Sequence, residues 1–378
     1  MSYIGKKIAI IGASYLQFPV IKRAKELGLE THVFSWKDGA VGFEYIDAFY
    51  PISILEKEDI LKICTDIKIN GIVSIASDVA VVTVNYIADK LGLTGNNISF
   101  TEAQTNKYQM RNYLFDAQLP IPTFEIITDA NKIDVEKYTY PIIVKPVDRS
   151  GSRGVTKVAR PDQLDTALAN ALKESFSKKV IAEQFIEGVE VSVESISWDG
   201  MHTILAVTDK ETTGAPNFIE TGHHQPSQLS GEIQEKIRQL VPKALDALGI
   251  QCGASHSELM ITESNEVYII EIGARMGGDF IGSELTRLST GYDFVKAVID
   301  VSIGLKPEVF LNNIKCNSGI KYIINSNSDL SQLIRSPLQW PEIIVDAHYF
   351  EDLESLSITS SADRYGYIIY KSNKKEVF

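Results

Sequence analysis

The segment from His256 to Glu271 places the tightest constraint on how this chain folds. Two apolar runs flank the polar residues 262–266, which is the pattern of a β-hairpin. If the turn centres on Ser264 and Asn265, Glu258 and Glu271 stand opposite one another, because both lie equally far from that centre. Directly opposed residues share one face of an antiparallel pair, with Cβ atoms about 4.5–5.5 Å apart. A shift of the turn by one residue would place the two side chains on opposite faces.

Two carboxylates that share a face repel each other, so the pair requires a cation between or beside them. A divalent metal ion bound through oxygen ligands is the natural choice. The second glutamate is followed directly by the glycine-rich loop 273–278, which carries the guanidinium of Arg275. Metal-binding carboxylates next to an arginine and a flexible loop indicate phosphate chemistry. The alternative is a surface hairpin with two solvated glutamates.

The N-terminal part alternates strand and helix patterns, which predicts a doubly wound parallel sheet with helices on both faces. Strand patterns occur at 7–11, 30–34 and 71–75, and helix patterns at 18–27, 56–68 and 79–91. Only Gly12 stands at the first turn, without the glycine spacing that lets a backbone approach a pyrophosphate. We therefore expect this unit to supply scaffold and part of a substrate wall. It should end near the loop residues 93–97.

The rest of the chain predicts two further α+β units. A helix is expected at 105–118, strands at 123–127, 141–145, 155–159 and 179–183, and a helix at 161–173. Longer strands follow at 189–197 and 202–208, then a helix at 230–248, the hairpin, a helix at 293–304 and a closing layer that includes 319–324. The expected units are 1–97, 98–185 and 186–378.

An apolar strand ends at Lys145 and leads into a small loop rich in glycine and serine, residues 147–155, which we call the flap. Glycines allow successive backbone N–H groups to turn inward as an anion nest, and Arg149 and Arg153 add positive charge. No helix follows directly, so this is not a P-loop. The pattern favours a mobile hairpin that closes over phosphates, and the alternative is a plain β-hairpin turn.

An extended connector between two strands, residues 183–190, exposes backbone groups that can pair with the edge of a purine ring. Glu183 is a candidate acceptor for an exocyclic amine, and Glu190 is a candidate acceptor for ribose hydroxyls. Taken alone, glutamates in such a connector are usually just solvated.

The order of these parts resembles the ATP-grasp superfamily over residues 1–305. The resemblance is carried by Thr105-Asn106-Lys107, Lys145 with the flap, residues 183–190, Glu258, and Glu271 to Arg275. It implies an ATP-grasp fold behind a Rossmann-like N-terminal unit, with Mg²⁺ (or Mn²⁺) on Glu258 and Glu271 and catalytic roles for Arg275, Lys145 and His223. The resemblance implies that ATP contacts Lys107, Lys145, Ser150, Gly151, Ser152, Glu183, Gln184, Phe185, Ile186 and Glu190.

One position departs from the superfamily pattern. Many members carry Asn two residues after the second glutamate, as a further metal ligand, whereas this chain has Gly273. The number of metal ions is therefore left open.

The residues Glu220 to Pro226 are expected to form an irregular loop of the substrate pocket. Their Glu-x-Gly-His pattern resembles the amino-acid ligases within the superfamily. One of His223 and His224 would orient a substrate carboxylate or transfer a proton, although hydrogen-bonded loop histidines are an equal alternative. His256 shares a strand face with Glu258, and its role in catalysis or in support of the metal site is left open.

The resemblance implies an ATP-dependent carboxylate–amine ligase that releases ADP and phosphate. A carboxylase-type enzyme acting on bicarbonate and a non-catalytic nucleotide-binding protein are the alternatives. A formal net charge of −12 argues against nucleic acid and anionic membranes as partners. Three scattered cysteines and the absence of a signal-peptide pattern favour a cytoplasmic location. The expected partners are small-molecule carboxylate and amine substrates, and a homodimer is left open.

Overall fold

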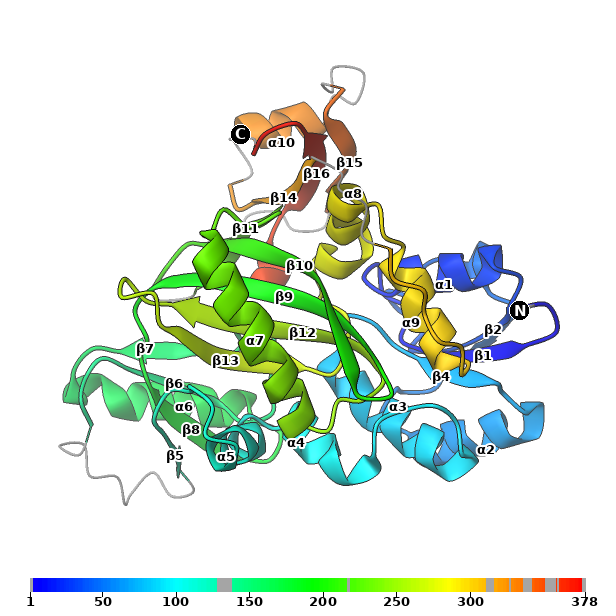
Figure 1. The fold of residues 1–378 in the computed structure, drawn as a ribbon, viewed down its shortest axis with the longest axis horizontal. Coiled ribbons are helices and arrows are strands. Elements are labelled where there is room, and N and C mark those ends of the chain that lie inside the picture. The colour runs from blue at the N-terminus through cyan, green and yellow to red at the C-terminus, as the bar shows by residue number, and fades with distance from the viewer. Residues whose placement is uncertain are drawn as a thin grey trace.

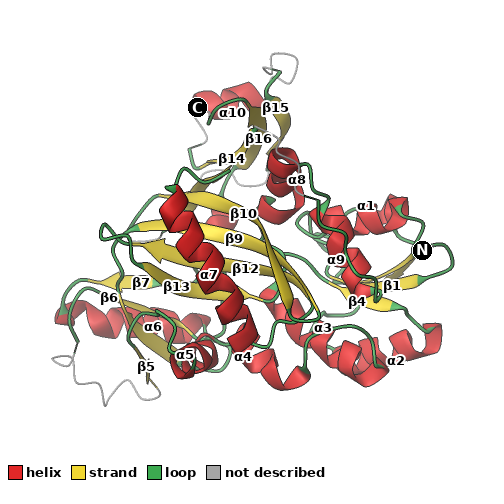
Figure 2. Cartoon of the chain, viewed as in Figure 1, coloured by secondary structure: helices red, strands yellow, loops and turns green. Residues whose placement is uncertain are grey.

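The computed structural model describes residues 3–127, 138–215, 218–310, 316–325, 328–335, 342–350, 358 and 360–375. Their strands form three sheets, one parallel and two antiparallel, as Figure 1 and Figure 2 show. Among these residues, no helix is long and apolar enough to cross a membrane.

The N-terminal sheet is parallel and has the order β3-β2-β1-β4. Its elements are β1 (Lys7–Ile11), α1 (Phe18–Glu26), β2 (Glu30–Phe34), β3 (Ala48–Tyr50), α2 (Lys57–Ile67), β4 (Gly71–Val73) and α3 (Asp78–Leu91). Because β2 and β4 flank β1, the strand order reverses at β1, and ligand sites of such sheets form at the carboxyl ends of the strands there. The predicted doubly wound sheet is confirmed, and the short strand β3 was missed.

The small sheet is antiparallel and has the order β5-β8-β6-β7. Helices α4 (Thr101–Thr105) and α5 (Lys107–Asp116) come before this sheet in the chain. The strands of the sheet are β5 (Phe124–Ile127), β6 (Ile142–Pro146), β7 (Thr156–Val158) and β8 (Val180–Gln184), and helix α6 (Leu164–Glu174) lies between β7 and β8 in the chain. Helix α6 buries the stripe Leu164, Ala167, Leu168 and Ala171 against this sheet, which is helical spacing. The predicted strands are found within one residue at each end, and the flap connects β6 to β7.

The large sheet is antiparallel and has the order β13-β12-β9-β10-β11-β14-β16-β15. Its strands are β9 (Val189–Trp198), β10 (Met201–Thr212), β11 (Glu220–Gln225), β12 (Gly253–Ile261), β13 (Val267–Gly273), β14 (Asn317–Ile323), β15 (Ile344–Tyr349) and β16 (Gly366–Ser372). Helix α7 (Gly231–Ala247) covers one face of β9, β12 and β13 through Ile233, Ile237 and Val241. The later part of the chain also has a π-helical turn at Ile281–Leu285 and the helices α8 (Thr286–Thr290), α9 (Phe294–Ser302) and α10 (Asp329–Ile334).

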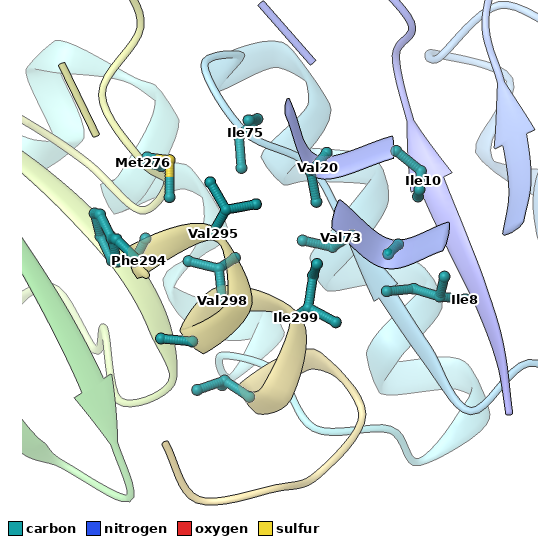
Figure 3. Close-up of a cluster of buried hydrophobic side chains, with 14 of the residues drawn as sticks. Ile8, Ile10, Val20, Val73, Ile75, Met276, Phe294, Val295, Val298 and Ile299 are labelled. Atoms are coloured by element: carbon teal, nitrogen blue, oxygen red, sulfur yellow. The ribbon is translucent and has the colours of Figure 1, made fainter. Parts of the chain in front are cut away.

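A shared apolar core joins the N-terminal sheet to the large sheet. Val295, Val298 and Ile299 of α9 face Val73 and Ile8 of the parallel sheet, and Phe294 lies beside Met276, as Figure 3 shows. Met276, just beyond β13, belongs to the same buried cluster. The loop that carries Arg275 is therefore anchored to the N-terminal unit.

Among the sequence expectations that are wrong, two concern whole elements. The segment from Glu220 to Pro226 is not an irregular loop, because residues 220–225 form β11 between β10 and β14. The strand has no apolar pattern in the sequence, because its polar side chains are buried among polar partners rather than in an apolar core. The helix expected at 105–118 is interrupted at Asn106, which has extended backbone angles and caps α5 with its side chain. The unit boundaries at 97 and 185 stay predictions.

Candidate active site

A cavity of about 190 Å³ lies where the small sheet faces β12 and β13 of the large sheet. Of the predicted site residues, these line it: Lys107, Lys145, Ser150, Gly151, Ser152, Glu183, Gln184, Phe185, Ile186, Glu190, Glu258, Glu271 and Arg275. His223 does not line this cavity but an adjoining one. The fold thus gathers residues that are far apart in the sequence, while their individual roles stay predictions.

Glu258 and Glu271 are directly paired across β12 and β13, as predicted. The turn lies elsewhere than expected, however, because Ile261 pairs with Val267 and the centre is therefore Ser264 alone. Continued without a break, this register would pair Glu258 with Ile270. A β-bulge next to Glu258 absorbs the extra residue and brings the two glutamates opposite one another.

Each carboxylate of this pair has a lysine beside it. Lys107 Nζ lies 2.6 Å from Glu271 Oε1, and Lys210 Nζ lies 3.3 Å from Glu258 Oε1. Lys210 also reaches Glu190 at 2.6 Å and Glu220 at 3.5 Å. Burial opposes the charge on Glu258, but Lys210, His256 and Arg275 together outweigh burial and hold the pKa of this carboxyl well below its usual value. Lys210 was not anticipated from the sequence, because the strand was expected to end at 208, whereas β10 continues to Thr212.

Glu183 lies in a buried group of charges at the start of the connector. Its carboxylate lies 2.8 Å from Arg111 Nε and 2.7 Å from Lys145 Nζ. Burial alone would raise the pKa of Glu183, but the two cations outweigh burial and hold it at about 2. Each carboxylate oxygen accepts about two hydrogen bonds, so Glu183 can still accept from an exocyclic amine. Arg111, fully buried in α5, was not anticipated from the sequence.

The lowered pKa of Glu183 predicts a loss of stability in acid. Because the folded-state pKa of about 2 lies below the reference value of 4.5, the contribution is complete above pH 4.5 and is lost as the pH falls toward 2. We expect the free energy of unfolding to decline over this range, measured by urea unfolding at several pH values. Glu183→Gln should flatten the decline. The exposed Glu263→Gln serves as the control and should keep the wild-type slope. Equal slopes in all three proteins would contradict the assignment.

The flap is exposed at its tip and anchored at its base. A Cβ added to Gly151 would meet no atom within 4 Å, and Ser150 and Gly151 are exposed. At the base, Asp148 accepts hydrogen bonds from the backbone N–H groups of Phe176 and Ser177 at 3.2 and 2.7 Å. The tip therefore has few contacts of its own to hold it in place.

We expect nucleotide to slow amide hydrogen exchange in residues 148–154. A glycine- and serine-rich tip with few apolar contacts opens easily, and phosphates bound by its N–H groups would hold it closed. Exchange is measured by mass spectrometry with and without a non-hydrolysable ATP analogue, and peptides of α7 provide the internal control. Equal protection of the flap in both states would exclude its role over phosphates.

Arg275 is held by a residue of the N-terminal unit. Its Nε and Nη2 donate to Asp78 Oδ1 and Oδ2 at 2.8 and 3.0 Å. Asp78 is the first residue of α3, and the short connection 74–77 joins it to the carboxyl end of β4. The sequence offered one signal, since Ser77-Asp78 is a helix start at the point where ligand sites of parallel sheets form.

The three candidate histidines have different surroundings. His223 Nε2 lies 3.5 Å from Asp279 Oδ2, and its side chain lines the adjoining cavity. His224 makes a hydrogen bond of 2.7 Å to the hydroxyl of Tyr370, and burial lowers its pKa to about 4. His256 Nδ1 lies 2.5 Å from Glu194 Oε1, which outweighs burial and raises its pKa to about 9. His224 is thus part of the sheet interior, whereas His223 and His256 face the cavities.

The adjoining cavity shares part of its wall with the first cavity. Both are lined by Ser150, Gly151, Lys210, Glu220, His256, Glu258 and Arg275. Asp279 borders the adjoining cavity and makes two hydrogen bonds of 2.8 Å with Arg364, whose guanidinium lies over the ring of Tyr322. Ser361 donates to the carboxylate of Glu220. The C-terminal strands and loops therefore close the far end of the site.

The oxygen ligands in this cavity suit a magnesium ion that also binds phosphates and water. They suit a metal ion bound by protein side chains alone less well. Among the residues that the structure describes, no group of three or more His, Cys, Asp or Glu side chains is placed to hold a metal ion. Two opposed carboxylates are what Mg²⁺ uses, because it takes one or two carboxylates together with phosphates and water. Glu258 and Glu271 therefore suit a metal that arrives with a nucleotide.

Comparison with known proteins shows similarity to ATP-grasp proteins. Residues 138–284 match the ATP-grasp domain. The D-alanine–D-alanine ligase B of Chromobacterium violaceum is 32% identical over 202 residues, which are 52% of this chain and 66% of that protein. The alanine–anticapsin ligase of Bacillus subtilis is 27% identical over 237 residues, which are 56% of this chain and 50% of that protein. The chain thus spans less than two thirds of the length of either relative.

Solved structures share the fold along almost the whole chain. The L-amino acid ligase from Bacillus licheniformis aligns with a TM-score of 0.84 and 24% identity, over 98% of this chain and 94% of that chain. The biotin carboxylase domain of the Hydrogenobacter thermophilus 2-oxoglutarate carboxylase, in complex with MgADP, ADP and bicarbonate, aligns with a TM-score of 0.75 and 19% identity, over 97% and 86%. At these identities the likeness shows the ATP-grasp fold, and it does not choose between amine and bicarbonate chemistry.

Proposed function

Because the chain is an ATP-grasp superfamily protein, we propose that it is an ATP-dependent ligase that joins a carboxylate to an amine. The observation that carries the proposal is the single cavity that brings together Glu258, Glu271, Lys107, Lys145 and Arg275 beneath the flap. Opposed carboxylates for a metal, three cations and an anion nest are the parts that phosphoryl transfer requires.

The proposed reaction has two steps. An oxygen of the substrate carboxylate attacks the γ-phosphorus of ATP, and the bond from that phosphorus to the bridging oxygen breaks, so that ADP leaves with the electron pair. The amine then attacks the acyl carbon of the acyl phosphate, phosphate leaves, and the amine nitrogen loses a proton. The products are an amide, ADP and phosphate. Amino acids are the proposed substrates, in line with the names of the ligases to which the chain is similar.

The residues around the phosphates have separable tasks in this scheme. Glu258 and Glu271 would hold Mg²⁺ or Mn²⁺, which supplies positive charge to the phosphate oxygens when bound. Lys107 and Lys145, both buried, would neutralise further phosphate charge. Arg275 would stabilise the charge that develops on the transferring phosphoryl group. Ser150, Gly151 and Ser152 of the flap would cover the phosphates and exclude water from the acyl phosphate.

The cavity wall formed by the connector, residues 183–190, suits a nucleoside. Glu183, with the backbone of Gln184, Phe185 and Ile186, would bind the edge of adenine, and Glu190 would accept hydrogen bonds from ribose hydroxyls. This proposal is supported by the position of all five residues on the cavity wall.

The adjoining cavity would hold the carboxylate and the amine. It begins at Arg275 and Glu258, so a substrate bound there lies next to the phosphate end of the first cavity. His223, on the wall of this cavity, would orient the substrate carboxylate or accept a proton from the amine. Gly273 supplies no side chain at the position where many superfamily members carry Asn.

The proposal is tested by measuring ADP release from the purified chain with ATP, Mg²⁺ and pairs of amino acids. ADP release that requires both a carboxylate and an amine is the expected result. ADP release driven by bicarbonate in their absence would replace the ligase with a carboxylase-type enzyme. Binding of ATP with no release under any of these conditions would leave a non-catalytic nucleotide-binding protein.

A further inference from the structure

We propose that Asp78 is a positioning residue of this active site, which holds the guanidinium of Arg275 at the phosphate end of the cavity. The N-terminal unit thereby supplies a part of the machinery, since Asp78 lies beside Arg275 on the wall of the adjoining cavity. The inference rests on the proposed function, because it assigns to Asp78 an effect on phosphoryl transfer.

The first support is the geometry of the ion pair. Two parallel hydrogen bonds of 2.8 and 3.0 Å join Arg275 to Asp78, and the side chains are only 13% and 16% exposed. Such a two-point contact fixes the plane of the guanidinium as well as its place. A single exposed ion pair would leave the side chain free to turn. The direction of Arg275 is therefore set by Asp78.

The second support is the backbone on either side of the pair. The N–H of Ala76 donates to the carbonyl of Met276 at 3.2 Å, and Ala76 has a φ of +57°, which costs energy for a residue with a Cβ. Ser77 caps α3 by accepting from the N–H of Ala80 at 3.4 Å. The loop after β4 is thus tied to the Arg275 loop by backbone and side chain together.

The third support is Gly273. Its φ lies outside the positive region, so its backbone does not require glycine. A Cβ at this position would lie 2.8 Å from Asp78 Oδ1 and 3.2 Å from both Nε and Cζ of Arg275. The ion pair therefore occupies the space that any side chain at 273 would need. The ion pair therefore leaves room only for glycine at this position.

Without Asp78, other carboxylates compete for Arg275. Glu194 and Glu271 are both close enough to favour its charge. A guanidinium drawn to Glu271 would occupy a carboxylate that the site needs for the metal ion. Asp78 thus keeps Arg275 available for the phosphoryl group and away from Glu271.

The test compares Asp78→Asn with a matched control. Asp293→Asn removes another ion pair between the same two units, Arg23 to Asp293 at 2.8 Å, and Asn still caps α9. We expect Asp78→Asn to lower kcat about 10- to 100-fold with little change in KM for ATP, because misdirected groups cost that much in rate. Asp293→Asn should keep the wild-type kcat. Equal kcat values in the two variants would mean that Asp78 has no effect on the rate beyond that of the control ion pair, and they would overturn the proposal.

A second measurement is independent of activity. Gly273→Ala should lower the midpoint of thermal unfolding in the wild-type chain, where the new methyl group meets Asp78. In an Asp78→Ala background, the same substitution should lower the midpoint by clearly less. Equal shifts in both backgrounds would overturn the steric argument. If the wild type releases no ADP with any substrate pair, the proposed function fails, while this coupling still reports on the ion pair.

Discussion

We expect Glu271→Gln to remove most of the ATP turnover while the chain stays folded. The substitution keeps the shape of the side chain but removes one of the two opposed carboxylates that would hold the metal ion. It also leaves Lys107 without the carboxylate that lies 2.6 Å from its Nζ. Charge stabilisation by a metal ion contributes several kcal/mol in a transition state, so a loss of about 10²- to 10³-fold or more in kcat is expected.

The matched control lies in the same hairpin. Glu263, exposed in the turn, is replaced by Gln, and this variant should turn over ATP like the wild type. Turnover is measured as ADP release, and circular dichroism shows whether each variant is folded. A folded Glu271→Gln protein with wild-type turnover would make the hairpin an ordinary surface element.

We expect Arg275→Ala to lower kcat about 10²- to 10³-fold and to change KM for ATP much less. This split is expected because the contact of Arg275 with the phosphoryl group would form mainly in the transition state. Arg275→Lys should recover only part of the loss, since an ammonium cannot make the two-point contact with Asp78. Arg160→Ala, which removes an exposed arginine paired with Asp162, is the control.

The alanine variant also leaves Asp78 without a partner, so its unfolding midpoint is measured alongside the kinetics. The lysine variant keeps the positive charge and separates a loss of stability from a loss of rate. If both variants weaken ATP binding as much as they lower kcat, Arg275 binds ground-state phosphate and does not act in the transition state.

Sequence patterns predicted the parts of the fold that depend on local periodicity. Alternating strand and helix segments indicated the parallel sheet, and the flap was found because glycine, serine and arginine cluster between two apolar strands. The pairing of Glu258 with Glu271 was predicted from an assumed turn centre, and it is correct only because a bulge next to Glu258 compensates for the true centre at Ser264.

The missed residues have partners far away in the sequence. Asp78 and Arg275 are separated by 197 positions, and Arg111 and Glu183 by 72. No local pattern marks such pairs, because they depend on how whole units pack. The strand β11 was missed for a different reason: Glu220, His223 and His224 are polar, yet all are buried in the structure. Burial of polar groups requires partners such as Tyr370, which comes from the far end of the chain.

The transfer of oxygen from the carboxylate to phosphate tests the central claim most directly. The wild-type chain is incubated with ATP, Mg²⁺, an amine and a substrate carboxylate labelled with ¹⁸O, and the released phosphate is examined by mass spectrometry. If the carboxylate is activated as an acyl phosphate, each phosphate released carries one labelled oxygen, because the attacking oxygen stays on phosphorus when the amine displaces it. Released phosphate without label would contradict the account, since water rather than the carboxylate would then have attacked ATP.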